Sequence, residues 1–290
     1  MKLSLTLLSL FFISSNSWHT PLQVTQQSLL WEISGKDLPG SSFLLGTMHL
    51  IPKKDFKYST KLDSILNISE EVIFEIDLNE MEDFNALLQV MMQSLMPDTN
   101  LQSLVSVEEY ELIKNYFSNK GLPLYVLDRL KPMFLYVLAE GSSYNLQENA
   151  VSYEMELYQK ALVKNIKTSG LETMVFQMSI FDSIPYKDQA QMLIKSIQIA
   201  ENQPNPLQDI IELYNKGAVE ELYQLIAEED EIITRIMIHQ RNLNWIQKMR
   251  EKMKINRGLY AVGAGHLGGP TGLIQLLENN GYQVRPLPLH

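Results

Sequence analysis

The chain has 290 residues, of which 45% are hydrophobic and 20% are charged, and it has a net charge of -10. This composition excludes disordered, collagen-like and coiled-coil proteins, and the acidic charge makes nucleic acids and anionic membrane surfaces poor partners. Because the chain has no cysteine, disulfides, thiolate metal sites and cysteine nucleophiles are excluded as well.

Residues 1–17 have the layout of a secretory signal peptide. Lys2 is followed by an apolar stretch, Leu3–Ile13, and Ser15 and Ser17 then stand at the small-residue positions of a cut before Trp18. The apolar stretch is shorter than the roughly 20 residues that a membrane span needs, although a buried N-terminal helix or an uncleaved anchor would also fit. We expect cleavage and export, to a periplasm or outside the cell, with no stable membrane insertion afterwards.

Short apolar runs predict strands near both ends of the mature chain. The first two runs flank a turn rich in glycine and proline, which predicts a hairpin, and the last follows a helix stop at Gly281. In chain order the predicted strands are Leu29–Ile33, Phe43–Leu45, Val72–Ile76, Gly258–Val262 and Tyr282–Val284.

Helical patterns occupy the middle of the chain. Ser106 and Glu109 form a capping box that opens a helix ending at Gly121, and two prolines predict a loop over residues 202–206. The other predicted helices are Asp83–Met96, Ser152–Lys164, Asp188–Glu201, Pro206–Tyr214, Val219–Ala227 and Ile232–Lys254. We therefore expect an α/β fold, in which a central sheet is built from N- and C-terminal strands and carries a large helical insertion over about residues 81–254.

A Gly-x-x-His sequence follows two of the predicted strands. Gly46 leads to His49, and Gly263 leads to His266, in a chain with only five histidines. Ligand sites in open α/β sheets lie beyond the carboxyl ends of strands, so these two imidazoles are candidates to converge. Gly-x-x-His can also mark an ordinary turn with a core histidine, but its repetition in one context favours a shared site.

Glu75 completes this pattern at the end of the run from Val72. An ionised carboxylate there is costly unless it meets a cation or good donors. Two histidines and one carboxylate around a divalent ion form a recurrent hydrolytic or oxygenase site. We predict that His49, His266 and Glu75 bind such an ion, and a thiolate-free set is compatible with Mn, Co, Fe or Zn.

Two further charged residues are candidates for the same site. Arg241 is predicted to hold a substrate carboxylate or a developing oxyanion, although a surface arginine on an amphipathic helix would show the same pattern. Glu172 is predicted to orient a ligand, the alternative being a carboxylate favoured at a helix N-terminus. The remaining histidines, His19, His239 and His290, have no predicted role in the site.

Together these residues resemble the TraB/GumN family, whose animal relatives include the TIKI metalloproteases. The resemblance runs in family order over nearly the whole mature chain, in the pieces Leu44–Leu50, Ile73–Asp77, Leu130–Pro132, Gly170–Thr173, Arg241-Asn242 and Ala261–Leu267. It implies a fold related to the erythromycin-esterase and ChaN-like proteins and, for TIKI-like members, a protease dependent on Mn²⁺ or Co²⁺.

The resemblance also implies roles for particular residues. His49, His266 and Glu75 match the family's proposed metal or catalytic positions, and Arg241 and Glu172 match further signature positions. Family members often have a Gly-x-Asp step where this chain has the stretch from Ala150 to Glu154, so Glu154 is a candidate substitute for that aspartate.

These observations predict a metal-dependent peptidase or hydrolase that acts on exported peptides or proteins. Glu75 would serve as the third ligand or as the general base toward bound water. One alternative is a non-catalytic protein that sequesters a metal, haem or signal peptide. Another is a metal-free esterase that uses one histidine as general base.

Overall fold

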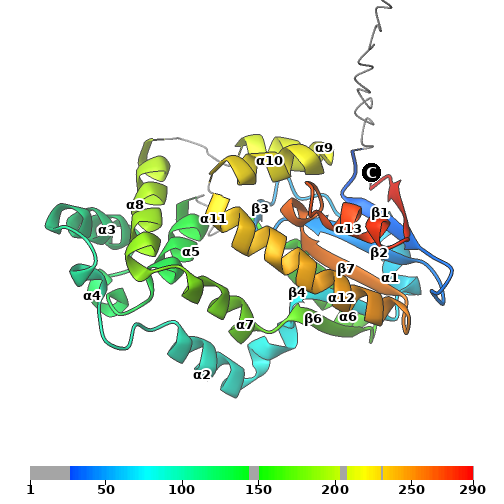
Figure 1. The fold of residues 1–290 in the computed structure, drawn as a ribbon, viewed down its shortest axis with the longest axis horizontal. Coiled ribbons are helices and arrows are strands. Elements are labelled where there is room, and N and C mark those ends of the chain that lie inside the picture. The colour runs from blue at the N-terminus through cyan, green and yellow to red at the C-terminus, as the bar shows by residue number, and fades with distance from the viewer. Residues whose placement is uncertain (1–26, 144–149, 203–207, 230, 290) are drawn as a thin grey trace, which may run out of the picture.

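The computed structural model describes residues 27–143, 150–202, 208–229 and 231–289. The predicted signal peptide, His19, His290 and most of the predicted loop at 202–206 lie outside the described residues. Within them, a central sheet packs between helices on one side of the molecule, and further helices extend away from it on the other (Figure 1). No helix in the described part of the chain is both long and apolar enough to cross a membrane.

The central sheet has six strands in the order β6-β4-β7-β2-β1-β8. The four strands from β6 to β2 run parallel, and β1 lies antiparallel between β2 and β8. Their bounds are β1 Leu30–Ser34, β2 Ser42–Thr47, β4 Glu71–Ile76, β6 Lys167–Glu172, β7 Gly258–Gly263 and β8 Gln283–Leu287. A separate two-stranded sheet pairs β3 (Ile51–Pro52) with β5 (Ala150–Val151). The α/β fold expected from the sequence is confirmed.

The strand β7, near the end of the chain, inserts between two strands from its beginning. It pairs with β2 on one side and with β4 on the other. This topology places the carboxyl ends of β2, β4, β6 and β7 along one edge of the sheet, which is where ligand sites of such sheets form.

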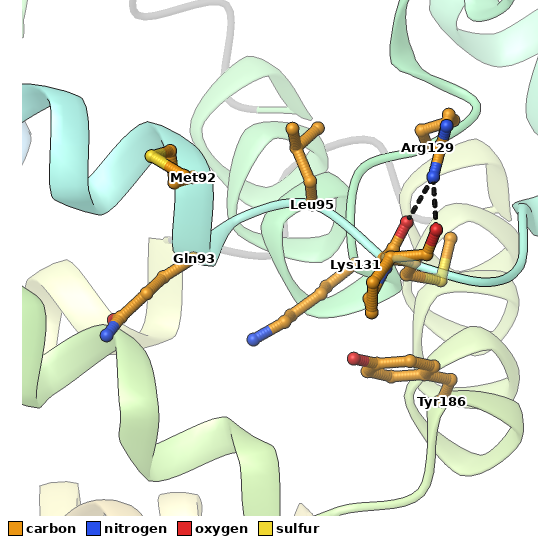
Figure 2. A pocket seen from close by; sticks show the side chains of 8 residues that line it. Met92, Gln93, Leu95, Arg129, Lys131 and Tyr186 are labelled. Atoms are coloured by element: carbon orange, nitrogen blue, oxygen red, sulfur yellow. Dashed lines mark hydrogen bonds between the residues drawn. The ribbon is translucent and has the colours of Figure 1, made fainter.

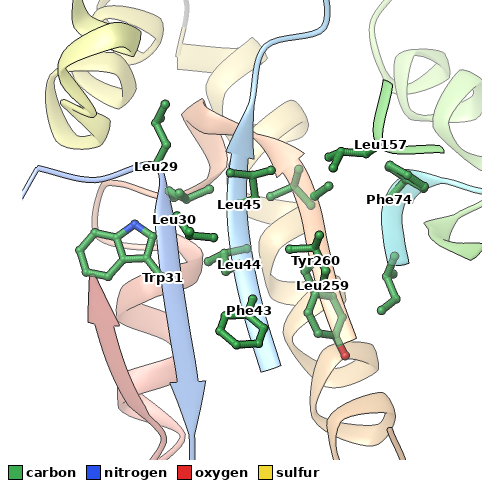
Figure 3. Packing of buried hydrophobic residues seen from close by; sticks show 14 of the residues in the cluster. Leu29, Leu30, Trp31, Phe43, Leu44, Leu45, Phe74, Leu157, Leu259 and Tyr260 are labelled. Atoms are coloured by element: carbon green, nitrogen blue, oxygen red, sulfur yellow. The ribbon is translucent and has the colours of Figure 1, made fainter. Parts of the chain in front are cut away.

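The core lies between the sheet and the helices on its two faces. Because neighbouring residues of a strand point to opposite faces, Glu75 faces α12 (Arg241–Met253) while Phe74 faces α6 (Tyr153–Val163), where its ring contacts Tyr158. Figure 3 shows the leucines and aromatic residues of β1, β2 and β7 packed together, with Phe74 and Leu157 beside them. Leu44, Leu45 and Tyr260 are fully buried.

Most of the remaining chain is helical, and a second core of buried residues lies among helices away from the sheet. That core contains Leu101, Ile113, Phe117, Leu135 and Leu193. The remaining α-helices are α1 Thr60–Ile68, α2 Phe84–Gln93, α3 Val107–Asn119, α4 Leu124–Leu127, α5 Pro132–Ser143, α7 Met174–Ser179, α8 Tyr186–Asn202, α9 Gln208–Lys216, α10 Val219–Glu229, α11 Glu231–Ile233 and α13 Leu273–Asn279. The 3₁₀-helices are η1 Leu78–Glu82, η2 Leu101–Ser103, η3 Ile180–Ser183 and η5 Ala264–His266, and η4 Thr234–Gln240 is a π-helix.

The five predicted strands are all present, and the capping box of Ser106 and Glu109 opens α3 as expected. Strand β6 was not predicted from the sequence, and it lies within the segment that we expected as a helical insertion. The long helix predicted over Ile232–Lys254 is interrupted, because residues Thr234–Gln240 form the π-helix η4 between α11 and α12.

Candidate active site

The carboxyl edge of the parallel strands carries the predicted site residues. Glu75 lies at the end of β4, Glu172 is the last residue of β6, and His266 is the last residue of η5, directly after β7. His49 follows β2 by two residues, and Arg241 opens α12 above them. All five side chains are linked by contacts, so the structure brings the whole predicted set together.

Glu75 is the centre of this group and is only 4% exposed. Its Oε2 accepts a hydrogen bond of 2.7 Å from Nη2 of Arg241, and its Oε1 accepts one of 2.7 Å from the backbone N–H of Gly263. Burial alone would raise the pKa of Glu75, but the charge of Arg241, the two neighbouring imidazoles and the N–H of Gly263 together outweigh burial and hold this pKa well below its usual range. Glu75 is therefore a carboxylate at neutral pH.

Arg241 joins two carboxylates from neighbouring strands. Its Nη2 and Nε donate to Oε2 of Glu172 at 2.9 and 3.0 Å, and the Nη2 bond to Glu75 completes the clamp. The guanidinium lies over the ring of Trp245, with 4.5 Å between Cζ and the ring centroid. Arg241 is 3% exposed and follows the π-helix η4, a kind of helical defect that is frequent at functional sites.

His266 is buried against the same helix. Its Nδ1 lies 2.7 Å from Oδ1 of Asn242, and its ring packs on Trp245 with 4.4 Å between centroids. Its Nε2 faces the carboxylates, 3.8 Å from Oε1 of Glu75. Burial lowers the pKa of His266 to about 3, so the ring is neutral at physiological pH.

His49 stands on the outer side of the group, with a side chain that is 67% exposed. Its Nδ1 lies 2.8 Å from Oε1 of Glu154, and its Nε2 lies 4.0 Å from Oε1 of Glu75. Thr47 and Ser152 donate to the Glu154 carboxylate at 2.6 and 3.0 Å, which fixes its orientation. The Glu154 charge raises the pKa of His49 to about 9.

A small space lies between these three groups because residue 263 is a glycine. A methyl group there would lie 3.1 Å from Oε1 of Glu75 and 4.0 Å from Nε2 of His49. It would also lie 3.7 Å from Cδ2 of His266. The backbone at Gly263 is ordinary, with φ -52, so what the glycine provides is room between the three side chains.

The distances from Oε1 of Glu75 to Nε2 of each imidazole are somewhat longer than those between metal ligands. A tetrahedral ion with bonds of about 2.1 Å separates its ligand atoms by about 3.4 Å. The spacings of 3.8 and 4.0 Å from Glu75 to the two imidazoles are wider by about half an ångström. Within the described residues, no group of three or more His, Cys, Asp and Glu side chains has the geometry to hold a metal ion.

A cavity of about 170 Å³ opens onto the group from the side of His49. Glu75 and Glu154 contribute its acidic part, and Gln177 of α7 contributes an amide. The rest of its lining is largely apolar and consists of Phe74, Ile76, Leu78 and Met155 together with Ser152. A small ligand with an apolar group could therefore occupy this cavity and contact His49 and Glu75.

A second pocket, of about 510 Å³, lies beyond the C-terminal end of α2 and contains none of the predicted site residues. Figure 2 shows Met92 and Leu95 at this pocket with Gln93, Lys131 and Tyr186. The methionine-rich helix α2 has no buried residue. An apolar face on a helix most often packs into the core, but that of α2 is exposed.

Several residues of the site were not given these roles by sequence reasoning. The sequence offered Glu154 only as a substitute for an aspartate, and its pairing with His49 depends on the first turn of α6 meeting the end of β2, where Thr47 contacts Glu154. Asn242 was noted beside Arg241, but nothing in the sequence connects it to His266. The room at Gly263 and the stacking on Trp245 likewise have no local sequence signal beyond the residues themselves.

Comparisons with known proteins identify the family of the chain. Residues 29–286 match the profile of the TraB/PrgY/gumN family. The chain belongs to this family. It is also similar to a metalloprotease TIKI homolog of Amphimedon queenslandica, with 23% identity over 348 residues that cover 99% of this chain and 67% of the relative. No solved structure matches the chain.

Proposed function

We propose that this TraB/PrgY/gumN family member is a metal-dependent hydrolase of peptide bonds in exported peptides or proteins. The observation that carries the proposal is the convergence of His49, His266 and Glu75 on the space left by Gly263. The similarity to a protein described as a metalloprotease supports the same reaction. Export rests on the predicted signal peptide, which lies outside the described residues.

The donor set fits a divalent ion of borderline softness, such as Mn²⁺, Co²⁺, Fe²⁺ or Zn²⁺. Both imidazoles direct Nε2 toward Glu75, while their Nδ1 atoms contact a carboxylate or an amide oxygen. Metal-binding histidines are usually oriented by such outer partners. The three glutamates outnumber Arg241 and the protonated His49 by one charge, which also favours a cation.

A divalent ion at this place would polarise the scissile carbonyl and supply a nucleophilic water at neutral pH. The chain's own residues prepare that site. The N–H of Gly263 and Nη2 of Arg241 each hold one oxygen of Glu75, which fixes the carboxylate plane. Because the donors of Arg241 are engaged by Glu75, Glu172 and the carbonyl of Met237, we assign Arg241 to positioning Glu75 in place of direct contact with substrate.

The cavity beside His49 supports a peptide substrate. Its apolar lining from β4 and α6 suits one side chain of a substrate, and Gln177 offers an amide that pairs with a peptide group. The exposed ring of His49 lies at the mouth of this cavity, where a scissile bond would enter.

The proposal is tested by digesting a peptide library with purified protein, with and without a chelator, and by repeating the digest after adding Mn²⁺ or Co²⁺. We expect cleavage that the chelator abolishes and the ion restores. His49→Ala and His266→Ala are expected to lose cleavage and metal while keeping the circular dichroism of the wild type. Undiminished cleavage in both variants would defeat the proposal.

One observation favours a second candidate, a metal-free hydrolase. The pair of His49 with the buried carboxylate of Glu154 resembles a histidine oriented for proton transfer. A pKa of about 9 keeps the proton on His49 at neutral pH, so in this reaction His49 would act as a general acid there. Cleavage that resists chelation would select this candidate.

A further inference from the structure

Asn242 lies beneath His266, at the second position of α12, and is fully buried. Its Nδ2 donates two hydrogen bonds, one of 3.0 Å to the carbonyl of His266 and one of 2.8 Å to the carbonyl of Thr271. Its Oδ1 lies 2.7 Å from Nδ1 of His266. The side chain therefore contacts both the ring and the backbone of the histidine.

The orientation of this amide is decided by the two carbonyls. If the amide were turned over, Oδ1 would face two carbonyl oxygens at hydrogen-bond distance, and no proton would lie between them. The orientation with Nδ2 on the carbonyls is thus the only one that satisfies them. It leaves an oxygen acceptor facing Nδ1 of His266, so Nδ1 must carry the proton.

The surroundings of Nε2, the other nitrogen of the ring, independently indicate the same tautomer. Nε2 of His266 lies 3.5 Å from Nη1 of Arg241, and a guanidinium has donors but no acceptor. A proton on Nε2 would point at another donor. An unprotonated Nε2 accepts from Nη1 of Arg241, whereas Oε1 of Glu75, at 3.8 Å, is too distant to accept a hydrogen bond from Nε2.

We propose that Asn242 is a positioning residue that fixes His266 as the Nδ1–H tautomer, so that the lone pair of Nε2 faces the space between Glu75 and His49. The consequence of this tautomer, a preformed nitrogen ligand for a divalent ion, rests on the proposed function. The tautomer itself is a property of the metal-free protein.

The test begins with the metal-free full chain carrying isotope-labelled histidine. Two-bond nitrogen–proton correlation spectra distinguish the two tautomers of a neutral imidazole, and His266→Gln assigns the signals of residue 266. We expect a protonated Nδ1 and an unprotonated Nε2 in the wild type. The opposite tautomer, or an equal mixture, would overturn the inference whether or not the protein hydrolyses peptides.

Two variants then separate positioning from simple structural support. Asn242→Asp and Asn242→Leu both lose the bonds to the carbonyls of His266 and Thr271, but only aspartate keeps an acceptor for Nδ1. We expect Asn242→Asp to retain the wild-type tautomer and Asn242→Leu to lose it, with a fall in Co²⁺ affinity of about 10- to 100-fold in the leucine variant.

Equal tautomers in the two variants would contradict the inference. If the leucine variant does not fold, the wild-type and aspartate spectra still decide it. If the wild type shows the expected tautomer but does not bind Co²⁺, the result would count against the proposed function and not against this inference.

Discussion

Strand β4 carries a buried glutamate near each end, and the two are used differently. Glu71 and Glu75 are 1% and 4% exposed and point to the same face, toward α12. At the amino end, Glu71 meets Ser169 at 2.6 Å, Lys252 at 2.9 Å and Lys167 at 3.4 Å. At the carboxyl end, Glu75 meets Arg241, a backbone N–H and two imidazoles.

The difference lies in what remains available to a ligand. The partners of Glu71 are two lysines and a serine hydroxyl, which satisfy a carboxylate and have no lone-pair nitrogen to offer at neutral pH. Around Glu75 there are two imidazoles, Gly263 leaves room, and a cavity gives access. Burial of a carboxylate alone therefore does not indicate a ligand site, and the imidazoles, the space and the access at Glu75 are what distinguish it from Glu71.

Removing the charge of each glutamate in turn should give the largest difference between the two ends of β4. We expect Glu75→Gln to lower Co²⁺ or Mn²⁺ affinity by at least ~100-fold, more than is typical of residues around the ligands, because the neutral amide replaces an ionised ligand. Glu71→Gln should leave metal affinity unchanged and lower the free energy of unfolding by about 2 kcal/mol through weakened charged hydrogen bonds.

Isothermal titration and urea denaturation of the two variants measure these effects. The account fails if Glu71→Gln loses the metal as fully as Glu75→Gln does, since the two ends of β4 would then not be distinct.

The carboxylate behind His49 should have a smaller effect than a ligand. Glu154→Gln keeps the shape of the side chain but removes the charge that orients His49, so we expect metal affinity to fall about 10- to 100-fold. Glu156→Gln, two residues along the same helix and exposed, is the matched control and should bind metal like the wild type. Equal affinities in the two variants would remove Glu154 from the site.

The space at Gly263 is testable without touching any donor atom. Gly263→Ala places a methyl group 3.1 Å from Oε1 of Glu75, and we expect metal affinity to fall about 10-fold, within the range of changes around the ligands. In Gly265→Ala the methyl group meets the end of the Ile226 side chain instead, and metal affinity should hold. Wild-type affinity in Gly263→Ala would show that the ion does not occupy this space.

The pH dependence of stability sharpens the comparison at the amino end of β4. Burial raises the pKa of Glu71, but the bonds from Ser169 and Lys252 outweigh it, so the net pKa is lowered. A lowered folded pKa contributes stability that is present above the unfolded value of about 4.3 and is lost as pH falls through the folded value. The stability gap between wild type and Glu71→Gln should therefore shrink from pH 7 to pH 3, and a gap that stays constant would contradict this assignment.

Much of the fold was predictable because its central strands are apolar runs with turn residues at their ends. Strand β6 was missed for a physical reason: it lies at the sheet edge, and of its residues only Leu171 and Glu172 are buried. Gly170 within it approaches Asp77 so closely that a methyl group on its Cα would lie 2.1 Å from a backbone nitrogen, a close contact between distant segments that no local pattern indicates.

The candidate site was predictable only as a set of residue types at strand ends. His49, His266 and Glu75 could be proposed because parallel strands end at one edge. The clamp of Arg241 on Glu75 and Glu172 depends on where the π-helix η4 directs the start of α12. That direction is set by packing between segments far apart in the chain, which a local pattern does not encode.

The most direct measurement is a crystal structure of the purified protein with Mn²⁺ or Co²⁺, with anomalous diffraction at the metal edge. We expect one anomalous peak per chain at about 2.1 Å from each of three atoms, Nε2 of His49, Nε2 of His266 and Oε1 of Glu75. A peak elsewhere, or an ion that contacts only one of the three, would contradict the account.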